Sequence, residues 1–246
     1  MSTNQNFFEL TRQLEEIVVS SDDKALKADM TRKDILTLFA YPLYVLKLES
    51  EVFFHEKNEE YVPKGALDFY GLFSDEDKKI HLYIIHNPND KTYTWNPVIW
   101  AYIRGIYVDT VSHELLHKYQ SEQRCLVGIT ATQRNPNFKE YKCIKDEDEF
   151  DNGLYLVSPD EVEADAYNFA CQLYRRYRSI EEALNALRSG SFKDVEMYDF
   201  YNAYVKKNSY VYKRLMKKTT WFLLHKYDEN TYKNSECNDY VVEDIQ

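Results

Sequence analysis

Two histidines and a glutamate lie close together in the segment DTVSHELLHKYQ, residues 109–120. His113 and His117 are four residues apart, and Glu114 directly follows the first histidine. On a helix this spacing places both imidazoles on one face, one turn apart. Their neutral nitrogens could then bind one Zn²⁺ at about 2.0–2.1 Å each. Glu114 could act as the general base that takes a proton from a water molecule activated by the ion.

The alternative is that these residues share a helix face by chance. With 6 histidines in 246 residues, chance gives this pattern in roughly one chain in a hundred if positions are independent. Leu115 and Leu116 suit a buried active-site helix. Lys118 does not, because the helices of metallopeptidases usually carry an uncharged residue at that place.

A catalytic zinc site needs a third protein ligand and one open position. Metzincins would carry a glycine and a histidine where this chain has Gln120 and Gln123. Peptide deformylases would carry a cysteine ahead of the histidines, and no cysteine precedes Cys125. The only histidine after His117 is His225, which is isolated in the sequence. A glutamate on a later helix is therefore the remaining option.

The segment PDEVEADAYNFA supplies such a glutamate. Glu161 and Asp165 are four residues apart and share one helix face. In this arrangement the glutamate binds zinc, and the aspartate accepts the other N–H of a ligand histidine. Glu163 is the rival ligand, about 200° around the helix from Glu161. The residue four positions after Glu163 is Tyr167, so only Glu161 has a carboxylate partner, and this favours it.

HELLH followed by EVEADAYNFA resembles the gluzincin pattern HExxH … ExxA[DN]xxA. Among gluzincins, the pattern most resembles that of ImmA/IrrE-type peptidases and their phage-encoded relatives. The resemblance covers about residues 66–175. The resemblance implies a small sheet whose edge strand pairs with an extended substrate. It also implies roles for five residues: zinc ligands His113, His117 and Glu161, general base Glu114, and Asp165 as the acid behind a ligand histidine.

The remaining patterns predict an α+β, zincin-like fold, with a small twisted sheet and an edge hairpin packed on the HExxH helix. We expect the hairpin at about residues 66–73 and 79–86, since two β-rich runs flank the turn SDEDKK. Asn96-Pro97 suits a helix start, and Gly105 could break that helix, with Asp109 capping a second piece.

Other elements are predicted on both sides of this core. Helical spacing begins with FFELTRQLEEIVV, and Thr31 suits the cap of a helix that Pro42 would end. Residues 121–158 look irregular, a helix opens at Pro159, and helices follow to about residue 227. We therefore expect three regions: an N-terminal helical and strand extension (1–60), the metallopeptidase core (61–178), and a C-terminal helical region packed on the core (179–246).

Composition limits the partners and the setting. The net charge of −10 argues against a nucleic-acid partner. No apolar run is long enough for a membrane helix, and the first residues do not resemble a signal peptide. The four cysteines form no CxxC pair and fit reduced thiols in the cytoplasm of a bacterium or phage-infected host. The oligomeric state is not indicated.

Two functions of different class remain. The first is a zinc-dependent peptidase acting on a protein or peptide substrate. The second is a virion or regulatory structural protein on a metallopeptidase scaffold with little or no activity. The complete set of two histidines, Glu114 and the Glu161–Asp165 pair favours the peptidase, because an inactive scaffold has no reason to keep Glu114.

Overall fold

The computed structural model describes residues 3–27, 29–57, 62, 64–128, 138–145, 150–192 and 195–227. The chain divides into two units, whose described residues fall within Met1–Tyr119 and Gln120–Glu236. The boundary lies inside one long helix, α4 (Pro97–Leu126), so each unit contains part of it. Mixed helices and small sheets confirm the α+β class. Each unit is described by itself below.

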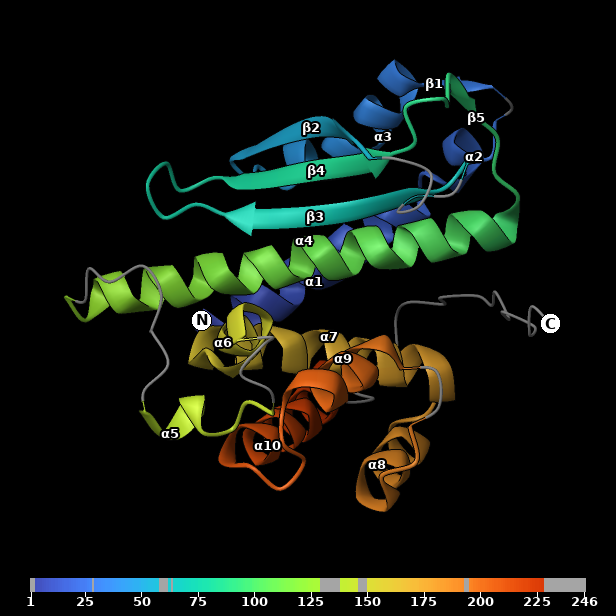
Figure 1. Cartoon of the computed structure of the whole chain (residues 1–246). Coiled ribbons are helices and arrows are strands. Elements are labelled where there is room, and N and C mark those ends of the chain that lie inside the picture. Colours follow the sequence, from blue (N-terminus) through green and yellow to red (C-terminus); the bar gives the residue numbers. More distant parts are fainter. Residues whose placement is uncertain are drawn as a thin grey trace. The chain divides into compact units, whose positions relative to one another are not determined.

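The first unit combines helices with two small sheets (Figure 1). Besides α4, its helices are α1 (Thr3–Val19), α2 (Asp22–Ala25) and α3 (Arg32–Val45). Its strands are β1 (Met30–Thr31), β2 (Ser50–Glu56), β3 (Leu67–Phe73), β4 (Ile80–His86) and β5 (Thr92–Tyr93). The larger sheet has the order β2-β4-β3, and β1 pairs with β5 in the smaller one.

The predicted hairpin is confirmed as β3 and β4, which pair antiparallel, while β2 pairs parallel with β4. Alternate residues of β4 face the core, and Ile80, Leu82 and Ile84 are fully buried. Such alternation is typical of a sheet with one covered face. The hairpin is thereby fixed in register, because a slip by one residue would turn this apolar set outward.

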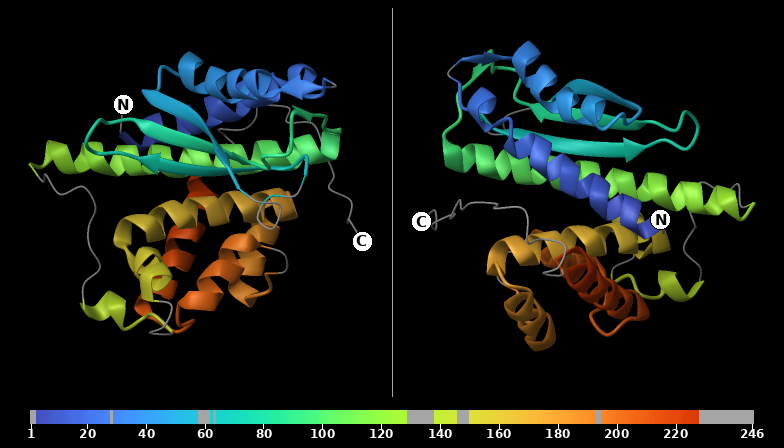
Figure 2. Two further views of the ribbon diagram at one scale, coloured as in Figure 1. Left: turned by 45° about the horizontal axis from the view of Figure 1, so that its top comes forward. Right: turned by 180° about the vertical axis from the view of Figure 1, so that it is seen from behind.

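An aromatic cluster joins the sheet to two helices. Phe39 of α3 lies 4.8 Å from Phe69 of β3 and 4.9 Å from Tyr107 of α4, between ring centroids. The Tyr107 hydroxyl donates a hydrogen bond to the Phe39 carbonyl oxygen at 2.8 Å. All three side chains are buried. These contacts hold α4 beside β3, and the strand runs along the helix in Figure 1 and in the right-hand view of Figure 2.

Helix α4 begins as predicted but is not broken. Asn96 caps it, because its Oδ1 accepts the Ile99 backbone N–H at 2.9 Å. The expected break at Gly105 is wrong, and Asp109 lies inside the helix instead of capping a new one. An internal glycine costs a helix only about 1 kcal/mol. The burial of Ile103 and Tyr107 beside Gly105 accounts for the continuity.

The cap of α3 is confirmed, but its end is not. Thr31 and Asp34 form a capping box, with the Thr31 side chain accepting from the Asp34 N–H and Asp34 accepting from the Thr31 N–H. Pro42 does not end the helix, which continues to Val45. Proline in the last turn removes only one hydrogen bond, and the Leu46 N–H still donates to the Pro42 carbonyl at 3.0 Å.

The second unit is built from helices and contains the last turns of α4. The others are α5 (Phe138–Tyr141), α6 (Phe150–Val157), α7 (Pro159–Tyr177), α8 (Ile180–Ser189), α9 (Glu196–Tyr204) and α10 (Tyr210–Lys226). Helix α7 packs against α10, where Tyr167 and Phe222 meet edge to face at 5.3 Å. Pro159 opens α7 as predicted. Residues 121–158 are less irregular than expected, since they hold the end of α4, α5 and α6.

No helix in the described part of the chain has the length and apolar character needed to span a bilayer.

Candidate metal centre

Helix α4 places His113 and His117 on one face. Their Nε2 atoms lie 3.0 Å apart, and both side chains are buried, with 8% and 7% of their surface exposed. The two rings are nearly perpendicular, at 75°, with centroids 4.7 Å apart. Two ligand atoms on a tetrahedral zinc are about 3.3 Å apart for bonds of 2.0–2.1 Å. The two nitrogens therefore already converge at nearly the separation that one ion requires.

Helix α7 carries Glu161 in its first turn and Asp165 one turn later. Both side chains are buried, with Glu161 only 1% exposed. Carboxylates near a helix N-terminus are favoured by the unpaired backbone N–H groups and the helix dipole. The first turn of α7 is thus a favourable place for a carboxylate side chain such as Glu161.

Two side chains from the last turns of α4 bind the first turn of α7. Gln120 donates a hydrogen bond to the Asp160 carbonyl oxygen at 3.2 Å, and Arg124 pairs with the Asp160 carboxylate at 2.6 Å. Gln120 follows His117 by three residues, and Asp160 directly precedes Glu161. These two bonds therefore fix the backbone on which Glu161 is mounted.

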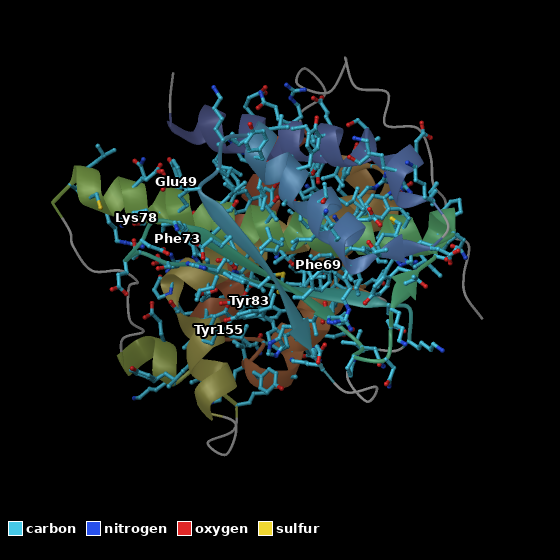
Figure 3. The ribbon with its side chains drawn as sticks, turned by 90° about the horizontal axis from the view of Figure 1, so that it is seen from above. Glu49, Phe69, Phe73, Lys78, Tyr83 and Tyr155 are labelled. Carbon is cyan, nitrogen blue, oxygen red and sulfur yellow. The ribbon has the colours of Figure 1, made fainter. Side chains whose placement is uncertain are left out.

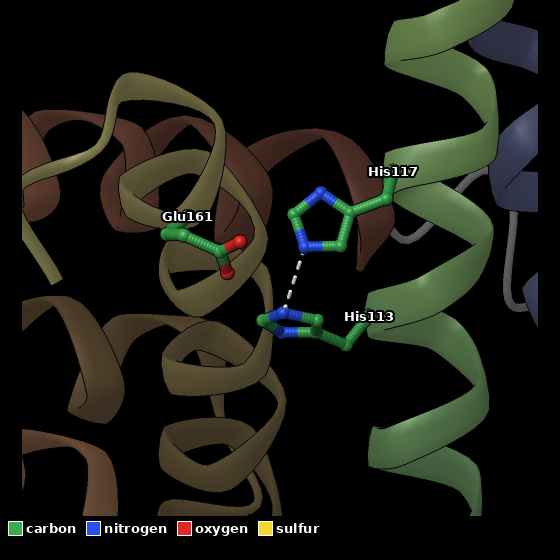
Figure 4. A group of neighbouring side chains, drawn as sticks. All are labelled: His113, His117 and Glu161. Carbon is green, nitrogen blue, oxygen red and sulfur yellow. Dashed lines mark hydrogen bonds between the residues drawn. The ribbon is translucent and has the colours of Figure 1, made fainter. Parts of the chain in front are cut away.

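His113, His117 and Glu161 form a buried group that could hold a metal ion (Figure 4). Their ligand atoms all lie within 4.8 Å of one another. Two imidazole nitrogens with one carboxylate oxygen make up a donor set that catalytic zinc uses, leaving a fourth position open. The residues present therefore fit a zinc ion by donor chemistry and by the separation of the two histidines.

Glu163 is not part of this group. Its carboxylate forms an ion pair with Lys218 of α10, on a different side of α7 from Glu161. Its side chain is 26% exposed. The two rival glutamates thus have different surroundings, and only Glu161 is grouped with the histidines.

Glu114 lies against strand β3. Its Oε2 accepts the backbone N–H of Phe73 at 2.6 Å. A Cβ atom built on Gly71 would come within 2.5 Å of the Glu114 Cγ. Glu114 is buried, with 6% exposed. Neither contact was predicted, because the sequence does not say which residues of β3 lie opposite a given turn of α4.

Tyr201 of α9 is a further residue that the sequence did not indicate. Its hydroxyl lies 2.9 Å from Asp165 Oδ2 and 3.1 Å from the Leu156 carbonyl oxygen. Burial, together with the charge of Asp165, raises the pKa of Tyr201 well above its ordinary value, so the phenol keeps its proton and donates it. With 22 tyrosines in the chain, nothing local distinguishes this one.

His225, the isolated histidine, is exposed on α10 and stacks on Trp221 with centroids 4.2 Å apart. It is not among the residues grouped as possible ligands in the described part of the chain.

Roles for these residues rest on their chemistry and geometry. Comparison with models of protein families, with characterised proteins and with solved structures finds no match to this chain.

Proposed function

We propose that the protein is a zinc-dependent peptidase with a zincin-like fold. The observation that carries the proposal is the buried group of His113, His117 and Glu161, with Glu114 next in sequence to the first histidine. A zinc ion held there would polarise a scissile carbonyl and lower the pKa of a water molecule to about 7. Side chains of the protein would transfer the proton and orient the ligands.

Glu114 is the general base in this proposal. Its Oε2 is held by the Phe73 N–H, so Oε1 is the oxygen that takes the proton from the attacking water. The same atom then carries that proton to the leaving amine. A carboxylate fixed by a backbone N–H needs no reorientation before the transfer, which reduces the barrier.

Asp165 orients a ligand imidazole by accepting its second ring N–H, which selects the tautomer whose other nitrogen faces the ion. Support for this role comes from the burial of Asp165 one turn after Glu161. Tyr201 in turn donates a hydrogen bond to Asp165 Oδ2. This bond fixes one oxygen of the carboxylate, so Oδ1 is the oxygen that accepts the imidazole N–H in this proposal.

The substrate in this proposal is an extended polypeptide segment in a bacterial or phage-infected cytoplasm. Strand β3 is at the edge of its sheet among the described strands, and such a segment would pair with outward backbone groups of this edge other than the Phe73 N–H, which Glu114 accepts. Main-chain pairing gives affinity without requiring a particular sequence, so side-chain pockets would set the cleavage specificity.

Metal analysis and cleavage assays test the proposal together. We expect about one zinc per chain, and loss of peptide cleavage when a chelator removes it, with recovery on adding zinc. A chain that binds no zinc and cleaves nothing would instead support a structural or interaction protein on this scaffold.

A further inference from the structure

The edge of β3 that faces away from β4 lies beside Glu114. The Ser74 N–H donates to the Lys79 carbonyl at 2.9 Å, so Ser74 and Lys79 form a hydrogen-bonded pair of the hairpin. Because such pairs alternate in an antiparallel ladder, Phe73 and Gly71 direct their N–H and C=O groups away from β4. The Phe73 N–H that donates to Glu114 therefore takes no part in the hydrogen bonds between β3 and β4.

Gly71 has no conformational reason to be glycine. It lies in the middle of a strand, and it is not among the glycines with positive φ, which are Gly65, Gly128 and Gly190. A glycine inside a strand weakens it and often marks the close approach of another group. Here that group is Glu114, whose Cγ, Cδ and Oε1 would lie 2.5, 3.0 and 2.9 Å from a Cβ on residue 71.

These two features act on the same carboxylate. Residues 71 and 73 are two apart on a strand, so their side-chain positions lie on one face, which is also that of buried Phe69. Phe69 and Phe73 are labelled in Figure 3. The absent side chain at 71 leaves the space that Glu114 fills, and the N–H at 73 holds its Oε2 at the end of that space. A larger residue at 71 would push the carboxylate off this N–H.

We propose that Gly71 is a positioning residue for the general base, acting together with the Phe73 N–H. This inference rests on the proposed peptidase function and deepens it. Helix α4 sets the position of the Glu114 backbone, and strand β3 sets the position of its carboxylate. The strand therefore takes part in catalysis through a position that supplies neither a metal ligand nor a proton-transfer group.

The test compares Gly71→Ala with Gly105→Ala. Gly105 is a matched control, because it also has ordinary backbone angles and a Cβ there would meet no other atom of the described residues within 4 Å. In the zinc-loaded protein we expect Gly71→Ala to lower kcat at least tenfold, with KM within about twofold and zinc content unchanged. Gly105→Ala should keep wild-type kcat. A purely structural defect at residue 71 would instead reduce zinc content or the folded fraction.

A second measurement needs no activity. Gly71→Ala should lower the midpoint of thermal unfolding in the wild-type background, but not in Glu114→Ala, where the methyl group enters vacated space. The inference is overturned if Gly71→Ala keeps wild-type kcat. It is also overturned if Gly71→Ala lowers the midpoint of thermal unfolding equally in the wild-type and Glu114→Ala backgrounds. If the wild-type chain binds zinc but cleaves no peptide, the proposed function and the catalytic role of Gly71 both fall. The unfolding midpoints then still decide whether Gly71 positions Glu114.

Discussion

The hydroxyl of Tyr201 and the Oδ2 of Asp165 are 2.9 Å apart, and this bond ties α9 to the helix that carries Glu161. Both side chains are buried, with Tyr201 completely so. A buried carboxylate that loses its donor is costly to keep ionised, so the phenol stabilises the charge that the proposed metal centre uses.

Tyr201→Phe removes this donor with little change in shape. We expect the free energy of unfolding to fall by about 1–3 kcal/mol, because Asp165 and the Leu156 carbonyl are left without this partner. Zinc affinity should fall several-fold, since Asp165 would hold a ligand ring less firmly. Tyr210→Phe is the control, because Tyr210 is 60% exposed, and it should match the wild type. Urea unfolding and zinc titration of both variants measure the two effects, and an unchanged Tyr201→Phe variant would refute them.

Substitutions along α7 distinguish the proposed ligand from its proposed supporting acid. Glu161→Ala leaves two histidines, too few for a stable catalytic site, so zinc binding should be nearly abolished. Asp165→Ala spares the three ligands and should weaken binding about 10–100-fold. Glu163→Ala, which removes the partner of Lys218, should bind as the wild type does. Zinc titration decides, and loss of the metal in Glu163→Ala would show that the wrong glutamate was assigned.

The pair between Arg124 and Asp160 supports the first turn of α7. Its side chains are only 16% and 13% exposed, so Arg124→Ala leaves a poorly solvated carboxylate and should cost about 1–3 kcal/mol of unfolding free energy. Arg12→Ala is the control, because the pairs of Arg12 with Glu9 and Glu16 are exposed and worth less than about 1 kcal/mol. Equal losses in urea unfolding would contradict this ranking.

His86 predicts a pH dependence of stability. Burial, aided by the nearby Arg32, lowers the pKa of His86 below its ordinary 6.5, and its buried Nε2 has no hydrogen-bond partner among the described residues. A lowered pKa means that the unfolded chain binds the proton more readily. Stability is therefore full above about pH 6.5 and falls as the pH drops towards the folded pKa. Unfolding free energies from pH 7.5 to 5 should fall less steeply in His86→Gln; an equal fall would exclude His86 as the cause.

Local signals in the sequence predicted much of the fold. The hairpin, the Thr31 cap and the helix starts at Pro97 and Pro159 depend on residues near in sequence, and all are present. The breaks expected at Gly105 and Pro42 were wrong because tertiary packing outweighs a penalty of a few kcal/mol. Of the predicted C-terminal region (179–246), the residues after Tyr227 lie outside the described part of the chain.

The candidate site was only partly predictable for the same reason. The four-residue spacings of His113 with His117 and of Glu161 with Asp165 are properties of a helix and can be read locally. The contacts of Glu114 with Phe73 and of Asp165 with Tyr201 join residues 41 and 36 positions apart. Such contacts depend on which elements pack together, and no spacing rule gives them.

The most direct test of the central claim is peptide cleavage by Glu114→Gln beside the wild type, both with measured zinc content. The amide keeps the size of the side chain but cannot accept the proton. We therefore expect zinc content equal to the wild type and a rate lower by a factor of about 10²–10⁴ or more. Wild-type turnover in the zinc-loaded Glu114→Gln protein would contradict the account, because some other group would then be the base.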